Sequence, residues 1–329
     1  MRAIVAKELG PAENLVIEDV VSPTPGPGQV LVDNRVAAIN FPDLLVMEGK
    51  YQFRPPLPFS PGKEGAGLIK EVGKGVSSFK PGDRVMLQVE YGAYAQEVIV
   101  DEHSCYSVPE GVSLEEAAAI GIAYQTAHFG LVARAGVKKG DKVLVTGASG
   151  SVGLATIQLA KAWGCEVIAG LTTISKADLV LQNGANHVID ISGDLVKNSI
   201  KDDIKNITGD GVDIVMEMVG GTVFDGAVRA VNFGGSVVVV GFTSGTIPTF
   251  KTNYALLKNI AITGVNWAEY RDRDPNWVQR VQSEIFDMVA DRTLKVPVQS
   301  VHPMEKVAEA CKILINRKVE GKVLLNLQD

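Results

Sequence analysis

A run of small residues between two apolar segments has the spacing most indicative of chemistry in this sequence. An apolar strand over 143–146 leads into Gly147, and a helical pattern starts at about residue 151. Gly147 and Gly150 permit a tight turn and close approach to a ligand, and Gly153 lets the helix pack on the strand. Amide groups at a helix N-terminus bind phosphate. The pattern predicts a dinucleotide site comprising Gly147, Ser149, Gly150, Ser151, Val152 and Gly153.

The alternative interpretation of this segment is a glycine-rich turn that binds no ligand. Strands and helices continue to alternate after it, which favours ligand binding. The spacing is G-x-x-G-x-x-G, and no Lys-Ser or Lys-Thr pair ends it, so a P-loop nucleotidase is not supported.

The residues after the next expected strand bear on which dinucleotide would bind. NAD enzymes place an acid there, against the ribose 2′-hydroxyl. Here no acid occurs between Glu166 and Asp178, whereas the side chains of Thr172, Ser175 and Lys176 can donate hydrogen bonds to a 2′-phosphate. NADPH is therefore the expected cofactor, with a solvated residue at a helix start as the alternative interpretation of Lys176.

The composition excludes several classes of protein. The chain has 329 residues with 32 Lys and Arg against 38 Asp and Glu, a net charge of −6. An acidic chain without a basic cluster is a poor nucleic-acid binder. Its three cysteines, at 105, 165 and 311, are too few and too far apart for a disulfide framework, which favours a reducing cytoplasm. No apolar run approaches the ~18 residues that a membrane helix requires.

Two different sequence patterns divide the chain into expected domains. Up to about residue 118, short β-branched stretches broken by Pro and Gly predict an irregular, largely antiparallel β domain with strands at 3–6, 30–39, 67–72, 84–88 and 95–100. A helix follows, opened by a capping box of Ser113 and Glu116.

From Lys142 onward, buried strands alternate with amphipathic helices, as in a doubly wound parallel sheet. Strands are expected at 143–146, 166–169, 187–189, 212–216, 236–240 and 260–265, and helices near 151–163, 176–183 and 223–231. Helices at 276–291 and 304–316 and a strand at 321–327 follow. The predicted fold class is α/β: a catalytic β domain of residues 1–122 and 266–329 with an inserted Rossmann domain of residues 123–265.

Several motifs resemble those of the medium-chain dehydrogenase/reductase superfamily, in its zinc-free, zeta-crystallin-like quinone oxidoreductase branch, and most closely those of quinone oxidoreductase-like proteins. Besides the glycine turn they are Asn40-Phe41-Pro42-Asp43, Pro61-Gly62-Lys63-Glu64-Gly65-Ala66-Gly67, Val72-Gly73, Pro81-Gly82-Asp83-Arg84-Val85, Thr126-Ala127, Gly184-Ala185 and Gly321-Lys322-Val323-Leu324-Leu325. The resemblance covers nearly the whole chain. It implies a partly open, GroES-like β-barrel as the catalytic domain, an NADPH-binding Rossmann domain and an active site in the cleft.

Two positions bear on the metal content of this expected site. Zinc-dependent relatives have a Cys where this chain has Asn40, and a His where it has Lys63. Neither Asn nor Lys is a plausible zinc ligand, so no metal is expected. Without a Lewis acid, the accessible acceptors are those that delocalise charge themselves, which are quinones and α,β-unsaturated carbonyls.

The resemblance also implies roles for four side chains near the nicotinamide. They are Asn40 as a donor, Asp43, Tyr51 as a ring or proton donor, and Tyr124. Each has a structural alternative: Asp43 as the cap of a helix over 43–47, Tyr51 as packing for the Pro-rich loop, and Tyr124 as part of a helix lining. Lys63 is expected to be solvated or salt-bridged rather than to assist an anionic substrate.

Further residues resemble the nicotinamide contacts of the family. These cofactor-binding residues are Thr126, Val219, Gly241, Phe242 and Thr243, where Gly241 would allow close approach of the ring. Ordinary packing at strand ends is the alternative.

The last Rossmann strand, over 259–265, is apolar and is expected at a sheet edge, where it would be exposed unless paired. In the family this edge commonly pairs across a twofold axis, so a homodimer is expected. The pair Tyr254 and Lys258 matches the Tyr-x-x-x-Lys motif of short-chain dehydrogenases, but a whole β domain precedes the glycine turn here, so a catalytic role for this pair is not expected.

Three functions remain open from the sequence. The leading one is an NADPH-dependent reductase of quinones or small enones. The second is an enoyl or acryloyl thioester reductase, which needs a basic patch such as Arg54, Arg271 and Arg273 could supply beside several acids. The third is a non-catalytic NADPH-binding or RNA-associated protein, against which the acidic charge argues.

Overall fold

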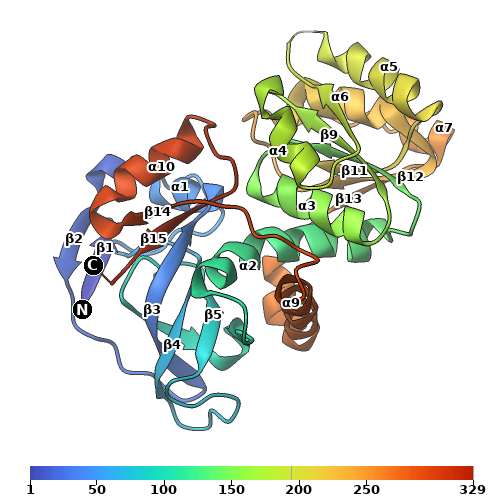
Figure 1. Cartoon of the computed structure of the whole chain (residues 1–329). Coiled ribbons are helices and arrows are strands. Elements are labelled where there is room, and N and C mark those ends of the chain that lie inside the picture. Colours follow the sequence, from blue (N-terminus) through green and yellow to red (C-terminus); the bar gives the residue numbers. More distant parts are fainter. Residues whose placement is uncertain (194, 329) are drawn as a thin grey trace. The chain divides into compact units, whose positions relative to one another are not determined.

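The computed structural model describes residues 1–193 and 195–328, which form two compact units. Unit 1 comprises Met1–Ile122, Tyr270–Arg292 and Val296–Asp329, and unit 2 comprises Ala123–Glu269 and Thr293–Lys295. Unit 2 is thus inserted in the chain of unit 1. The colours of Figure 1 follow the chain, from blue in the first segment of unit 1 to red in its last.

The main sheet of unit 1 is built around the long strand β3 (Gln29–Ile39). Its strands run in the order β14-β15-β3-β4-β5-β7, with β6 also paired to β3, and all pairs except β14 with β15 are antiparallel. The other strands are β4 (Glu64–Val72), β5 (Arg84–Gln88), β6 (Glu97–Asp101), β7 (Cys105–Ser107), β14 (Val298–Pro303) and β15 (Lys322–Asn326). The prediction of a largely antiparallel β domain is confirmed.

Smaller elements complete unit 1. A separate antiparallel ribbon pairs β1 (Arg2–Val5) with β2 (Val16–Asp19). The helices are α1 (Phe41–Met47), α8 (Ala268–Arg273, which spans the unit boundary), α9 (Pro275–Ala290) and α10 (Val307–Ile315). Figure 1 shows α10 beside β14 and β15, where its buried side chains join a core cluster with Ile4, Met47 and Leu325.

Unit 2 contains a six-stranded sheet in which every pair is parallel. Its order is β10-β9-β8-β11-β12-β13, so the first strand in sequence lies inside the sheet and the chain winds outward in both directions. This is the predicted doubly wound arrangement. The strands are β8 (Lys142–Thr146), β9 (Glu166–Leu171), β10 (His187–Asp190), β11 (Val212–Glu217), β12 (Val231–Val239) and β13 (Ala261–Gly264).

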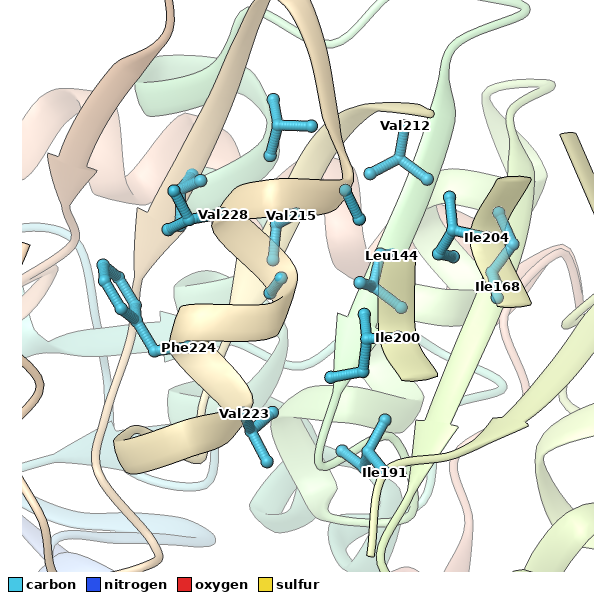
Figure 2. Close-up of a cluster of buried hydrophobic side chains, with 14 of the residues drawn as sticks. Leu144, Ile168, Ile191, Ile200, Ile204, Val212, Val215, Val223, Phe224 and Val228 are labelled. Atoms are coloured by element: carbon cyan, nitrogen blue, oxygen red, sulfur yellow. The ribbon is translucent and has the colours of Figure 1, made fainter. Parts of the chain in front are cut away.

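Helical segments cover both faces of this sheet. Successive residues of a strand point to opposite sides, so two neighbouring residues of β11 show what packs on each face. Val215 packs in a cluster with the buried side of α5 (Val196–Thr208) and α6 (Gly221–Ala230), as Figure 2 shows. The next residue, Met216, lies against Gly130 in the π-helical segment η3 (Phe129–Ala135). The remaining helices of the unit are α3 (Ser151–Ala162), α4 (Ala177–Gln182) and α7 (Asn253–Lys258).

The chain passes from unit 1 to unit 2 within α2 (Leu114–His128). The predicted capping box at its start is confirmed. The Ser113 hydroxyl accepts a hydrogen bond from the Glu116 amide at 3.0 Å, and the Glu116 carboxylate accepts one from the Ser113 amide at 2.9 Å. Within the described part of the chain, no helix is both long and apolar enough to span a membrane.

Candidate functional site

The glycine turn of unit 2 leads into the N-terminus of α3, which has no side-chain cap. Gly147 has φ 63°, a left-handed conformation that favours glycine, and the helix N-cap is Gly150, which has no side chain to occupy the first-turn amides. A Cβ atom on Gly153 would lie 2.6 Å from the carbonyl oxygens of Gly147 and Ala148. Glycine is therefore required at 147 and 153 by the backbone itself, and the turn has the form of a phosphate cradle.

The end of β9 supplies the second part of this candidate cofactor site. Beyond Leu171 the side chains of Thr172 and Ser175 are exposed, and Lys176 is half-buried at the end of the 3-10 turn η4 (Ile174–Lys176). The first acid after the strand, Asp178, already lies in α4. Hydroxyl and ammonium donors thus stand at the strand end where an acid would select NAD.

The end of β11 carries a fully buried carboxylate that the sequence analysis did not single out. Glu217 Oε1 accepts hydrogen bonds from the Thr146 hydroxyl at 3.1 Å and from the amides of Val219 and Gly220 at 3.0 Å each. Oε2 accepts from the Gly220 amide at 3.1 Å. Burial raises the pKa of Glu217 above its ordinary value, against the lowering effect of these hydrogen bonds.

The structure brings four of the predicted cofactor residues together beside Glu217. The Thr243 amide donates to the Met218 carbonyl at 3.0 Å, and the Ser244 amide donates to the Val219 carbonyl at 2.9 Å. Val219 therefore lies against the loop that carries Gly241, Phe242 and Thr243. A Cβ atom on Gly241 would meet only the Met218 carbonyl oxygen, at 3.9 Å, so the backbone there is open to close approach.

Tyr124 does not fit the catalytic role that the resemblance implied. Its side chain is buried, and its hydroxyl donates to Oε1 of Gln158 on α3 at 3.3 Å. The same oxygen accepts a hydrogen bond from the Lys295 amide at 2.9 Å. Burial raises the pKa of Tyr124 well above its ordinary value. The phenol is thus part of an internal network, and we do not retain it as a proton donor; Thr126, on the same helix, is buried as well.

In unit 1, Asn40 belongs to a buried network of charged and polar side chains. The Lys322 ammonium lies 2.6 Å from Asn40 Oδ1 and 2.6 Å from Glu64 Oε1. Asn40 Nδ2 donates to the same Glu64 oxygen at 3.0 Å, and Glu64 Oε2 accepts from the Ile122 amide at 2.7 Å. The oxygen and the nitrogen of the Asn40 side chain therefore both have hydrogen-bond partners within the protein, which indicates a structural role.

This network and its neighbours have the wrong chemistry for zinc. A fixed ammonium stands beside Asn40 and Glu64, and electrostatic repulsion would oppose a divalent cation there. The Lys63 ammonium is not part of this network and donates to the Glu90 carboxylate. Among residues 1–193 and 195–328, no three His, Cys, Asp or Glu side chains are placed to share a metal ion.

Asp43 is buried at the third position of α1, which begins at Phe41 rather than at Asp43. Its Oδ2 accepts hydrogen bonds from the Asn40 amide at 2.8 Å and the Tyr94 hydroxyl at 2.9 Å. Its Oδ1 has no hydrogen-bond partner in the described part of the chain. Burial raises the pKa of Asp43 from 3.8 to about 6, against the effects of the Asn40 amide, Lys63 and Tyr94.

Tyr51 is half-buried above a cation. The Lys63 ammonium lies 4.8 Å from the centre of the Tyr51 ring and 2.9 Å from Glu90 Oε2, so the salt-bridged interpretation of Lys63 is confirmed. Burial, and then the charge of Glu90, raise the pKa of Tyr51. The phenol therefore stays protonated at neutral pH and can donate a hydrogen bond.

Glu90 also binds Arg271, at 2.5 Å. Burial raises the pKa of Glu90, but Lys63 and Arg271 outweigh it and the net pKa is lowered. Because the Arg271 side chain is buried and paired with Glu90, it cannot serve as part of the basic patch that a coenzyme A thioester would need.

The Tyr254 and Lys258 pair lacks the geometry of a proton-transfer pair. The Lys258 ammonium donates to the carbonyl oxygens of Arg229 and Val231, at 2.8 and 2.6 Å, at the end of α6. Tyr254 packs against the core cluster of Figure 2. Lys258 thus satisfies backbone carbonyls.

Known proteins are similar to this one over nearly the whole chain. Residues 26–110 match the model of the alcohol dehydrogenase GroES-like domain, and residues 151–283 match that of the zinc-binding dehydrogenases. Quinone oxidoreductase-like protein 2 of Rattus norvegicus is 37% identical over 99% of this chain and 92% of its own length. Quinone oxidoreductase of Homo sapiens is 34% identical over 99% of this chain and 98% of its own.

Two solved structures are similar in fold as well. A mycobacterial protein complexed with NADPH superimposes with a TM-score of 0.92 and 30% identity, covering 99% of each chain. The quinone oxidoreductase of Escherichia coli, also complexed with NADPH, gives a TM-score of 0.89 and 29% identity, covering 99% of this chain and all of that one.

Proposed function

Since the chain belongs to the medium-chain dehydrogenase/reductase superfamily, among the quinone oxidoreductase-like proteins, we propose that it is a zinc-independent oxidoreductase that uses NADPH to reduce quinones or α,β-unsaturated carbonyls. The observation that carries the proposal is the Lys322–Glu64–Asn40 network, which puts an ammonium group where a metal-dependent relative needs ligands. An acceptor must then delocalise the transferred charge by itself.

We propose that NADPH binds to residues of unit 2. We assign the pyrophosphate to the amides of the turn formed by Gly147, Ser149, Gly150, Ser151, Val152 and Gly153, because the N-cap Gly150 provides no side-chain cap for that helix end. We assign a 2′-phosphate to Thr172, Ser175 and Lys176, which follow a strand that ends without an acid. Two similar structures are complexes with NADPH, which supports the assignment.

Bound NADPH supplies a hydride to an electron-poor carbon of the acceptor. The negative charge that develops on the acceptor oxygen needs a hydrogen-bond donor in the transition state. We propose Tyr51 for this role because its phenol carries a proton at neutral pH and its half-buried ring lies 4.8 Å from the Lys63 ammonium. Asn40 and Asp43 are engaged with their neighbours, so we propose that they hold the end of β3 and the start of α1 in place.

We further propose a homodimer that forms through the edge of the sheet of unit 2. β13 is the last strand of that sheet, and its residues Ala261 and Gly264 are exposed. Leu256 and Leu257 of α7 are 78% and 71% exposed, unusual values for leucine. Sedimentation as a monomer at micromolar concentration would exclude this dimer. The three cysteines are free and buried, which is consistent with our proposal of a cytoplasmic protein.

The test of the function is oxidation of NADPH and NADH by the purified protein, followed by the absorbance of the reduced nicotinamide, with benzoquinone, phenanthrenequinone, 2-alkenals, cyclic enones and acryloyl-CoA as acceptors. We expect turnover that prefers NADPH and conjugated acceptors. Tyr51→Phe removes only the hydroxyl and should lower kcat by about 100-fold without changing NADPH affinity. Tight NADPH binding without turnover of any acceptor would contradict the proposed function.

A further inference from the structure

Glu217 lies where the two halves of the sheet in unit 2 meet. The strand order β10-β9-β8-β11-β12-β13 reverses direction between β8 and β11. Thr146 ends β8 and Glu217 ends β11, and the Thr146 hydroxyl donates to the Glu217 carboxylate across this boundary. In such folds the dinucleotide crosses the sheet at the reversal, with one mononucleotide over each half.

The carboxylate fixes the backbone that follows it. Its two oxygens accept the amides of Val219 and Gly220, at 3.0 to 3.1 Å, so the chain must turn back over the end of its own strand. Gly220 and Gly221 have φ 79° and 55°, and a Cβ atom on Gly220 would lie 2.5 Å from the Thr246 carbonyl oxygen. The turn therefore favours glycine at both positions, and the Glu217 carboxylate accepts the amides of Val219 and Gly220 within it.

The same turn holds the loop after β12. The Val240 amide donates to the Glu217 carbonyl at 2.8 Å, and the amides of Thr243 and Ser244 donate to the carbonyls of Met218 and Val219. In return, the Gly221 amide donates to the Thr246 carbonyl at 3.1 Å. The loop from 241 to 246 is thus tied at several points to the turn that Glu217 organises.

We propose that Glu217 is a positioning residue for the nicotinamide half of the cofactor site, an inference that rests on the proposed NADPH-dependent function. The 2′-phosphate residues at the end of β9 belong to the β8-β9-β10 half, so the nicotinamide mononucleotide falls over β11, β12 and β13. Val219, Gly241, Phe242 and Thr243 lie on that half, and each is placed through the turn or loop that the Glu217 carboxylate holds. Glu217 itself points into the protein and does not touch the ligand.

This assignment predicts that loss of the carboxylate affects one half of the cofactor selectively. Glu217→Gln keeps the size of the side chain. Its NH2 group, a hydrogen-bond donor, takes the place of one carboxylate oxygen and then faces backbone N–H groups that are donors themselves. We expect the affinity for NADPH to fall by about tenfold, because hydrogen bonds to a buried charge are lost. Affinity for 2′,5′-ADP, which lacks the nicotinamide half, should stay within about twofold of the wild-type value.

Two further variants keep the experiment decisive. Glu166→Gln removes a carboxylate from the same unit, where it pairs with the half-exposed His187, and should leave both affinities unchanged. Thr146→Val removes a single donor to Glu217. It should weaken NADPH binding by about threefold and leave the affinity for 2′,5′-ADP unchanged. This variant replaces Glu217→Gln if the latter does not fold.

The outcomes separate the two proposals. Failure of the wild-type protein to bind NADPH overturns the proposed function, and the role of Glu217 with it. Wild-type binding combined with equal losses for NADPH and 2′,5′-ADP in the variants overturns the role of Glu217 alone, because that result indicates general damage to unit 2. Unchanged affinities for both ligands overturn it as well. Only the selective loss of NADPH affinity supports it.

Discussion

Among the residues that the structure describes, each unit buries one glutamate completely, and the two side chains are stabilised in different ways. In unit 1, Glu64 is paired with the Lys322 ammonium at 2.6 Å and also accepts from Asn40 and the Ile122 amide. In unit 2, Glu217 accepts from a hydroxyl and from backbone amides. The first carboxylate is neutralised by a cation and the second is held by neutral dipoles.

The difference determines what each carboxylate organises. The Glu64–Lys322 pair joins β4 to β15 through two residues that are 258 positions apart in the chain, so it secures the C-terminal segment of unit 1 to the rest of its sheet. Glu217 instead binds the amides of residues two and three positions beyond it, so it sets the shape of one turn. An ion pair thus links distant segments, whereas an amide-bound carboxylate shapes local backbone.

The largest effect is expected from removal of the cation. Lys322→Met keeps much of the side-chain volume but leaves Glu64 as a buried charge without its counterion. Breaking a buried ion pair in this way costs about 3–5 kcal/mol. We therefore expect the thermal midpoint of unit 1 to fall by roughly 10 °C or more, measured by calorimetry.

The double variant Glu64→Gln/Lys322→Met tests the cause of that loss. The neutral Gln side chain can still accept from the Ile122 amide and no longer needs a counterion, so the double variant should be more stable than Lys322→Met alone. A double variant as unstable as the single one would mean that packing around Lys322, and not the uncompensated charge of Glu64, sets the loss.

Asp43 provides a third, intermediate case, because neutral groups donate to one of its oxygens while the other has no partner in the described chain. Burial raises its pKa from 3.8 to about 6. Since the folded state holds the proton more tightly, this group stabilises the fold fully below pH ~4 and loses that contribution as pH rises through about 6. The shift corresponds to roughly 3 kcal/mol.

Asp43→Asn mimics the protonated carboxyl at every pH and isolates this effect. The free energy of unfolding of the wild type, relative to Asp43→Asn, should fall by roughly 2 kcal/mol between pH 4 and pH 7, because a part of the full change lies below pH 4. Paired denaturant titrations at the two pH values measure the difference, and contributions from all other groups cancel in it. A difference that does not change with pH would show that Asp43 keeps an ordinary pKa.

Local sequence patterns predicted much of the fold. The strand, glycine turn and helix over 143–163 and the capping box at Ser113 depend on residues within a few positions of one another, and the structure confirms both. Helix α5 was not predicted, because its apolar stripe of Val196, Ile200 and Ile204 is narrow and lies within a run of Lys, Asp and Asn. Strand β14 was not predicted either, since it is defined by its pairing with β15.

The candidate site shows the same limit more strongly. Glu64 and Lys322 were recognised as parts of two motifs, but the contact between them joins distant segments and no spacing in the sequence indicates it. Tyr124 has the right residue type for a proton donor, yet its hydroxyl is directed to Gln158. The signal for Glu217 was present, as an acid directly after the apolar run Ile214-Val215-Met216 and shortly before Gly220 and Gly221, but the sequence does not show that its carboxylate faces its own turn.

The smallest expected effect concerns the neutral donors around Glu217. Thr146→Val removes the hydroxyl that donates to Glu217 and accepts from the Met218 amide, while the amides of Val219 and Gly220 still hold the carboxylate. The loss of stability should therefore be about 1–2 kcal/mol, well below that of Lys322→Met.

The matched control is Thr156→Val on α3, whose buried hydroxyl donates to the Val152 carbonyl within its own helix and should matter less. Denaturant titration of both variants measures the difference. A loss as large as that of Lys322→Met would mean that the amides alone cannot hold a buried charge, and equal losses for the two threonine variants would remove the Thr146 hydroxyl from the set of groups that stabilise Glu217.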